Sequence, residues 1–310
     1  MDEIEKAFQE GSALYKAESY SDAVKKIQFA AKHGHADAQY RFGECYYYGQ
    51  GVIQNYEEAV KWYRKAAEQG DADAQFNLGF CYYEGQGVIQ NYEEAVKWYR
   101  KADEQGDADA QFNLGFCYYE GQGVIQNYEE AVKWYRKAAE QGDADAQFNL
   151  GFCYYEGQGV IQNYEEAVKW YRKAAEQGNA DAQYSLAGCY MSGDGVRQDY
   201  GVALKWYLEA AKQGNVEAMV TVGDWYSEDG NDDEALNWYL QSFEEGDTRR
   251  YFRVASIYED QKNYKKALDL YNIAVPIFGQ MAEERYESLF AQLYPGTPIP
   301  KIDFPEDDDE

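Results

Sequence analysis

Thiols are the most regularly spaced reactive groups in this chain of 310 residues. They lie one period of 36 residues apart, at Cys45, Cys81, Cys117, Cys153 and Cys189. A disulfide framework needs cysteines that can pair, whereas here each repeat carries one thiol at the same position. We therefore expect small, buried, reduced cysteines, which are typical of a cytoplasmic protein.

Acid–base chemistry has few candidate residues. The only histidines, His33 and His35, lie in the sequence AAKHGHADAQ, which is typical of a helix end, where a cation suits the helix dipole. The carboxylates Glu93 and Glu94 fall in a predicted first helical turn, where negative charge is favourable and Glu93 can pair with Lys97. No nucleophile, base and orienting group can be assembled, so the sequence predicts a protein that is not an enzyme and has no cofactor or metal.

The elements that carry these residues are repeats. Three consecutive blocks, which start at Ala72, Ala108 and Ala144, each read close to ADAQFNLGFCYYEGQGVIQNYEEAVKWYRKAAEQG. Diverged copies occupy 36–71 and 180–215, and a shorter copy lacks the glycine-rich loop. A period in the thirties with two apolar helical patterns marks a unit that must stack on neighbours to bury its apolar face. The sequence therefore predicts a helical solenoid.

Local signals place two helices in each block. Asp71 can cap the first helix, and Asn91 can cap the second with Glu94 three residues on, the spacing of a capping box. Between them, Gly85 and Gly87 supply the backbone freedom for a tight connection. The sequence GQG is too short to indicate a phosphate-binding loop.

An apolar face recurs on both helices. Leu78 and Cys81 mark it on the first helix, where Gly79 allows the partner helix to approach, and Trp98 and Tyr99 mark it on the second. We expect the tryptophans of the second helices to form a packing ladder: Trp62, Trp98, Trp134, Trp170, Trp206 and Trp238.

These patterns match a known family. The pattern A-x-A-x-x-x-L-G-x-x-Y-x-x-G-x-G-V, followed by A-x-x-W-Y-x-x-A-A-x-x-G, resembles the Sel1-like repeat, a relative of the tetratricopeptide repeat. The resemblance implies an all-α fold, a right-handed α-solenoid of stacked antiparallel helix pairs with a concave face. Most members resemble adaptors or scaffolds. The secreted branch with two cysteines per repeat, to which penicillin binding and β-lactamase activity belong, differs from this chain in that spacing.

The same pattern predicts the domain organisation. Five repeats of 36 residues span 36–215. We expect an N-terminal capping helix pair at 1–35 and two shorter pairs similar to tetratricopeptide units at 216–276. A C-terminal capping helix at 277–294, which Pro295 ends, and a disordered acidic tail at 295–310 should follow.

Charge narrows the class of partner. The formal net charge is −27, from 29 basic and 56 acidic residues, and no basic run offsets it, so nucleic acid is excluded as a partner. The excess of acidic residues favours a protein or peptide partner that carries basic residues, or else it serves solubility. The N-terminus lacks a secretory signal, and no apolar stretch approaches the roughly 20 residues of a bilayer span, which predicts a cytoplasmic protein without membrane insertion.

The resemblance also implies which residues line the concave face as a groove for a partner. In the alternative that we keep open, the Phe76 class packs between neighbouring first helices and the tyrosines alone reach solvent. The groove residues are Tyr40, Glu44, Tyr47, Phe76, Phe80, Tyr83, Glu84, Phe112, Phe116, Tyr119, Glu120, Phe148, Phe152, Tyr155, Glu156 and Tyr184.

Agreement among the central copies does not mark function, because they agree even at solvent positions such as Lys97 and Arg100. Departures from the repeat are more informative. Gly188, Met191 and Ser192 replace the Phe80, Tyr83 and Glu84 equivalents, which predicts a groove that is less aromatic toward the C-terminus.

The first hypothesis for the function is a non-enzymatic adaptor that binds a protein or peptide. The alternative, which also comes from the resemblance, is an immunity-type protein that neutralises a secreted bacterial toxin. An enzyme is the third.

Overall fold

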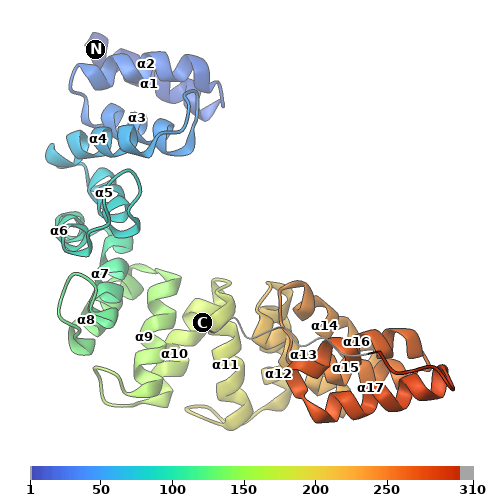
Figure 1. The fold of residues 1–310 in the computed structure, drawn as a ribbon. Coiled ribbons are helices and arrows are strands. Elements are labelled where there is room, and N and C mark those ends of the chain that lie inside the picture. The colour runs from blue at the N-terminus through green and yellow to red at the C-terminus, as the bar shows by residue number, and fades with distance from the viewer. Residues whose placement is uncertain (1, 301–310) are drawn as a thin grey trace. The chain divides into compact units, whose positions relative to one another are not determined.

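The computed structural model describes residues 2–300, which form α-helices joined by short connections, without a β-strand (Figure 1). The predicted all-α fold of successive packed helix pairs is confirmed. Of the predicted acidic tail, residues 301–310 lie outside the described part of the chain. The chain divides into two compact units, Met1–Gln177 and Gly178–Glu310.

The first unit holds five helix pairs, each packed on the preceding one. Its helices are α1 (Glu3–Lys16), α2 (Tyr20–Lys32), α3 (Ala36–Tyr48), α4 (Tyr56–Glu68), α5 (Ala72–Glu84), α6 (Tyr92–Asp103), α7 (Ala108–Glu120), α8 (Tyr128–Gln141), α9 (Ala144–Glu156) and α10 (Tyr164–Glu176).

The second unit continues the pattern with three pairs and one further helix. Its helices are α11 (Ala180–Ser192), α12 (Tyr200–Lys212), α13 (Val216–Glu228), α14 (Asp232–Glu244), α15 (Tyr251–Asp260), α16 (Tyr264–Phe278) and α17 (Gln280–Leu293).

The predicted caps form. Asp71 Oδ1 accepts a hydrogen bond of 2.7 Å from the amide of Ala74, and Asn91 Oδ1 accepts one of 3.0 Å from the amide of Glu94. The return bond of the capping box does not form, because the amide of Asn91 donates to the carbonyl of Tyr82 instead. Glu94 is thereby released and pairs with Lys97 at 2.5 Å, which corrects the predicted pairing through Glu93.

Glycine allows the two helices of a pair to touch. A Cβ on Gly115 would lie 2.5 Å from Cδ1 of Tyr135, whose ring is fully buried. The predicted role of this glycine class is confirmed. In α11 the equivalent residue is Ala187, and there the facing Tyr207 is 6% exposed. The larger residue thus shifts the tyrosine outward.

The connections between the two helices also depend on glycine. Gly85 and Gly87 have φ angles of 72° and 71°, as their predicted backbone freedom requires. A Cβ on Gly87 would lie 2.3 Å from the carbonyl carbon of Tyr56, which begins α4 of the preceding pair. Each loop is therefore packed against its neighbour.

Buried glutamines join successive pairs, a feature that the sequence analysis missed. The amide of Gln75 donates to the carbonyl of Ala67 at 3.1 Å, and Gln105 donates to Gln75 Oε1 at 3.0 Å. Because an unpaired buried amide is costly, these bonds favour one register between pairs. The buried glutamines are Gln39, Gln75, Gln111, Gln147 and Gln183.

The tryptophans recur at the predicted positions and pack into the core clusters. Trp98 packs in one cluster with Tyr63 of α4 and Leu78 of α5, so it joins three successive helices. Lys101 covers its other side, with Nζ 3.8 Å from the ring centroid. Each predicted tryptophan belongs to a core cluster or packs against one, and Trp206 packs against the cluster that holds Trp238.

The ends of the solenoid differ from the predicted boundaries. The last helix begins at Gln280 rather than Ile277, because α16 continues through Pro276 to Phe278 and ends where Gly279 adopts a φ of 60°. At the other end, His33 ends α2 as predicted. His35 instead caps α3 and bonds Glu5 at 3.0 Å, so it has a structural role.

The glycine contact predicts a difference between two alanine substitutions. Gly115→Ala should destabilise the protein by about 1–3 kcal/mol, because the added methyl group overlaps the Tyr135 ring. Gly188→Ala, at a helical position where the nearest atom is 3.7 Å away, should be neutral or stabilise by up to about 1 kcal/mol. Thermal unfolding followed by circular dichroism measures both. Equal effects would contradict the close-contact explanation.

The aspartate caps predict a pH dependence of stability. Burial raises the pKa of Asp71, Asp107 and Asp143 above the ordinary value of 3.8, although a backbone amide opposes the shift. A raised folded-state pKa adds stability below the unfolded value, and this stability is lost as the pH rises through the folded value. Asparagine caps the same position at Asn179 and Asn215.

The triple variant Asp71→Asn, Asp107→Asn, Asp143→Asn should therefore gain melting temperature over the unmodified chain at pH 7 and lose that gain near pH 4. Thermal melts across this range measure the difference. A difference that does not change with pH would show that ionisation of these caps has no cost.

Candidate functional site

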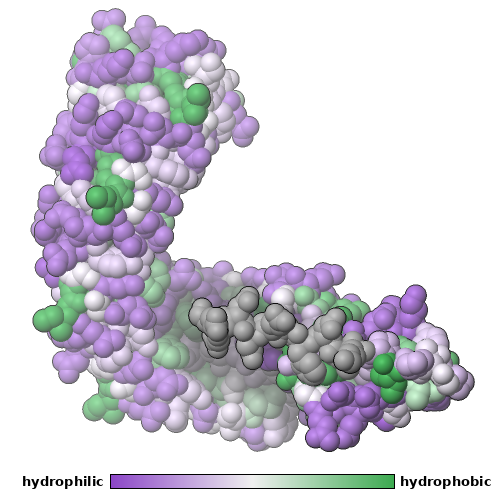
Figure 2. Space-filling view, viewed as in Figure 1, coloured by the Kyte–Doolittle hydropathy of each residue, from purple (hydrophilic) through white to green (hydrophobic). Residues whose placement is uncertain are grey.

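The predicted groove residues of the three central copies lie on α5, α7 and α9. The aromatic side chains are half-buried, and the glutamates at the helix ends, Glu84, Glu120 and Glu156, are exposed. Figure 2 shows a mainly hydrophilic surface on the first unit, interrupted by separate hydrophobic patches. The three aromatic classes differ in what they contact.

The Phe76 class packs inward. The ring centroids of Phe76 and Tyr99 are 5.9 Å apart, and Phe76 lies against the core cluster that α6 and α7 share. Phe112 and Phe148 repeat the contact with Tyr135 and Tyr171. This class therefore packs against the second helix of its own pair, and its rings stay half-buried.

The Tyr83 class connects neighbouring pairs. The ring of Tyr83 lies edge-on to Tyr92 at 5.1 Å, and its hydroxyl donates to Gln122 in the loop of the next pair. Tyr119 donates to Gln158 at 2.5 Å in the same way. Burial raises the pKa of Tyr83 to about 12, so the phenol remains a donor. Part of this surface is thus committed to joining the repeats.

The Phe80 class forms the remaining aromatic surface. Phe116 is half-buried, and its ring meets that of Tyr83 from the preceding pair at 6.5 Å. Each phenylalanine of this class, at Phe80, Phe116 and Phe152, is followed four residues later by an exposed glutamate. Because residues four apart lie on one face of a helix, the phenylalanine and the glutamate share that face. This arrangement presents aromatic carbon edged by carboxylates.

The first repeat is polar at the same position. Glu44 replaces phenylalanine there, and it forms an ion pair of 2.6 Å with Arg41 and accepts a hydrogen bond of 3.1 Å from Tyr40. Burial raises the pKa of Glu44. Tyr47 donates to Gln86 at 2.5 Å and so belongs to the joining class. The aromatic face of the first unit therefore starts at α5.

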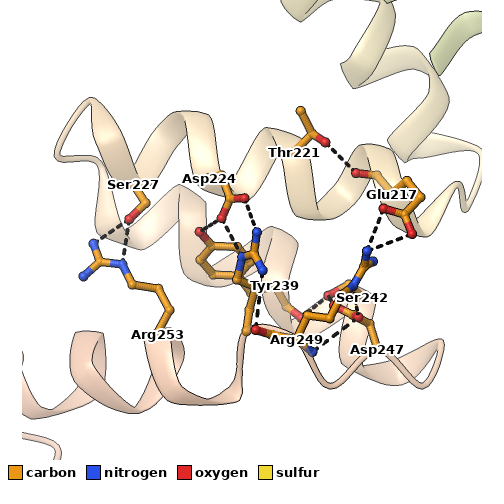
Figure 3. Close-up of polar contacts among 10 residues, drawn as sticks. Glu217, Thr221, Asp224, Ser227, Tyr239, Ser242, Asp247, Arg249 and Arg253 are labelled. Carbon is orange, nitrogen blue, oxygen red and sulfur yellow. Dashed lines mark hydrogen bonds and ion pairs between the residues drawn. The ribbon is translucent and has the colours of Figure 1, made fainter. Parts of the chain in front are cut away.

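Polar residues replace the aromatic face on α13 and α15 of the second unit (Figure 3). Arg250 holds Asp224 through bonds of 2.8 and 2.5 Å, and Tyr239 donates to the same carboxylate at 2.7 Å. Burial opposes ionisation of Asp224, but these hydrogen bonds hold its pKa below the ordinary value. Arg249 bonds both oxygens of Glu217. Asp224 stands at the Phe80 position of its repeat, and the network around it was not recognised from the sequence.

Four isoleucines form a second apolar feature that the sequence analysis missed. One lies in the connection of each repeat from α3 to α10, and each is about nine-tenths exposed: Ile53, Ile89, Ile125 and Ile161. The signal in the sequence was the apolar pair Val-Ile after the glycines, of which the valine is half-buried and the isoleucine points to solvent. Substitutions at these exposed isoleucines can serve as controls for substitutions at the groove residues.

The reactive groups do not gather into a site. All five cysteines are free and buried, as predicted, and burial raises the pKa of Cys81 to about 12. Within residues 2–300 no group of three or more histidines, cysteines or acidic residues is placed to hold a metal ion. No helix in that range is long and apolar enough to cross a bilayer.

Comparison with known proteins agrees with the repeat architecture. The family model described as Sel1 repeat matches seven segments: 36–71, 72–107, 108–143, 144–179, 180–215, 216–247 and 251–275. The last two cover the pairs that the sequence analysis compared with tetratricopeptide units. No curated protein matches the chain.

Solved structures show the same fold. The protective antigen c5321 of uropathogenic Escherichia coli, which displays an SLR fold, is similar with a TM-score of 0.82 and 34% identity over 94% of this chain and 65% of that one. This chain thus spans less than two thirds of that protein. A Sel1 repeat protein from Oxalobacter formigenes has a TM-score of 0.71 and 42% identity over 76% and 96% of the two chains.

An immunity protein from Pseudomonas aeruginosa, Pa5087, is similar with a TM-score of 0.42 and 23% identity over 67% of this chain and 81% of that one. A likeness at this level carries no argument about function. Toxin neutralisation stays a prediction.

The joining tyrosines predict a stability difference. Tyr119→Phe removes the hydroxyl that bonds Gln158 of the next pair, and should cost about 1 kcal/mol while keeping the aromatic ring. Tyr164→Phe is the matched control, because its exposed hydroxyl bonds Gln162 two residues away and joins no pairs. Urea unfolding measures both. An equal stability for all three proteins would show that the bond between pairs does not contribute.

Proposed function

Because the chain belongs to the Sel1 repeat family, we propose that it is a non-enzymatic adaptor that binds a segment of a partner protein on the first helices of its repeats. The Sel1 fold is typical of protein-interaction scaffolds. The observation that carries the proposal is the surface of Phe80, Phe116 and Phe152, which is edged by exposed glutamates on α5, α7 and α9. Aromatic side chains that are partly accessible are common anchors of protein interfaces.

The charge defines the partner's chemistry. The net charge of −27 and the exposed Glu84, Glu120 and Glu156 favour a segment that carries lysine or arginine beside apolar residues. Complementary charge raises the association rate and orients the partner more than it adds affinity. The partner segment would place apolar side chains on the phenylalanines and basic side chains on the glutamates.

The proposal also covers location and activity. It places the protein in the cytoplasm, which the five free thiols support. It assigns no reaction, since the described cysteines are buried and the two histidines contact Phe29 and Glu5 at helix ends.

A comparison of captured proteins tests the surface. The variant Phe80→Ala, Phe116→Ala, Phe152→Ala should capture its partner from native lysate at least about tenfold less well than the intact chain, because several interface anchors are lost. The variant Ile89→Ser, Ile125→Ser, Ile161→Ser is the matched control and should capture it unchanged. Circular dichroism confirms the fold of both. Loss of capture in the isoleucine variant alone would place binding on the connections and contradict the proposal.

The exposed glutamates allow a second test that leaves the core intact. Glu84→Gln, Glu120→Gln, Glu156→Gln should weaken capture most at low ionic strength, since salt screens exposed charges in the unmodified chain as well. Unchanged capture at every salt concentration would contradict the proposal that the partner carries basic residues.

A further inference from the structure

A pocket of about 420 Å³ opens on the second unit, where α11, α12 and α13 meet. Its walls are Met191 of α11, Tyr200 of α12, Trp225 and Glu228 of α13, and Asp229, which follows α13. None of its walls belongs to α5, α7 or α9. Met191 also packs against the core cluster of α11 to α14.

Departures from the repeat create the pocket. Met191 stands where the central copies have the Tyr83 class, whose ring lies against the tyrosine that begins the second helix. Gly188 likewise replaces the phenylalanine of the Phe80 class. With both rings gone, Tyr200 is 53% exposed, and Trp225 replaces the buried cysteine of the next repeat.

The aromatic walls suit a cation. The rings of Tyr200 and Trp225 lie 6.4 Å apart at 66°, so a bound group can meet one ring by its face and the other by its edge. Tryptophan and tyrosine faces attract ammonium and guanidinium groups, and the polarisable Met191 completes an apolar wall for the carbon chain behind such a group.

The negative charge of the pocket also favours a bound cation. No side chain in residues 2–300 forms an ion pair with Glu228 or Asp229. Arg253, which reaches the last turn of α13, bonds Ser227 and Asp232 instead. Both α11 and α13 end at the pocket without a basic residue in the last turn, and helix C-termini carry partial negative charge. The two carboxylates therefore have no ion-pair partner among the described residues, and a bound cation would also meet the partial negative charge of the two helix ends.

We infer that this pocket binds a lysine or arginine side chain of a peptide segment. The stem lies along Met191 and Tyr200, the charged end meets the Trp225 ring, and Glu228 and Asp229 accept its hydrogen bonds. Met191 and Glu228 occupy the Tyr83 and Glu84 positions of the repeat, so the pocket lies on the face that a segment on first helices would follow. The inference rests on the proposed adaptor function and names the partner residue for this one site.

Methionine methyl groups give a local readout of the full chain. The sequence has four methionines, and in protein with ¹³C-labelled methyl groups the Met191 signal is identified by its loss in Met191→Leu. The probe is the blocked peptide Leu-Ala-Lys-Ala-Leu, with arginine or uncharged norleucine in place of lysine in two further peptides. Free n-butylammonium tests whether the cation alone is sufficient.

The lysine and arginine peptides should shift the Met191 signal in a saturable way, and the norleucine peptide and n-butylammonium should shift it far less. Tyr200→Ala, and separately Glu228→Gln with Asp229→Asn, should weaken peptide binding about threefold to tenfold. Glu244→Gln with Glu245→Gln is the charge-matched control, because Glu244 ends α14 and Glu245 follows it, as Glu228 and Asp229 do at α13. Unchanged Met219 and Met281 signals show that each variant is folded.

Equal shifts with the norleucine peptide would identify an apolar site and overturn the inference, and so would an unmoved Met191 signal. Equal binding by n-butylammonium would overturn the assignment to a peptide. If the signal does not move but the phenylalanine variant still loses its partner, the pocket assignment fails and the adaptor function stands. If the signal responds and the phenylalanine variant captures normally, the pocket stands and the assignment of function to α5, α7 and α9 fails.

Discussion

In most helix pairs a tyrosine of the second helix is buried against a glycine of the first, as Tyr135 is against Gly115, and the rest of the structure depends on this contact. It brings the helix axes close enough for the small cysteines and alanines to fill the core. It also fixes the rotation of the first helix, which directs leucine and cysteine inward and Phe116 toward the surface. Where alanine replaces the glycine, in α11, the facing Tyr207 stays buried but is 6% exposed.

Neighbouring pairs are joined by polar bonds as well as by apolar packing. Gln75 donates to the carbonyl of Ala67 and Gln105 to that of Gly70, both in the preceding pair, and the hydroxyl of Tyr83 bonds the loop of the next pair. Because buried polar groups are costly unless paired, these bonds penalise other registers. The Tyr83 class joins pairs, and the proposed function assigns the Phe80 class and the exposed glutamates to a partner.

The sequence was sufficient to predict the fold, because the repeat period, the helix caps and the glycines all act within one repeat. Asp71, Asn91, Gly79 and Gly87 each take the predicted role. Contacts that depend on the placement of two repeats were not predictable from one, which explains the missed glutamine bonds and the network around Asp224. The pocket beside Trp225 depends on several departures at once, and each of them looks neutral when it is considered alone.

The central claim is that a partner lies on the first helices, against Phe116, and not on the connections between helices. Photo-crosslinking tests it directly, with benzoylphenylalanine placed at position 116 in one protein and at position 125, in the exposed connection, in another. The proposed arrangement predicts one crosslinked partner from position 116 and none from position 125. A partner crosslinked from position 125 alone would contradict it.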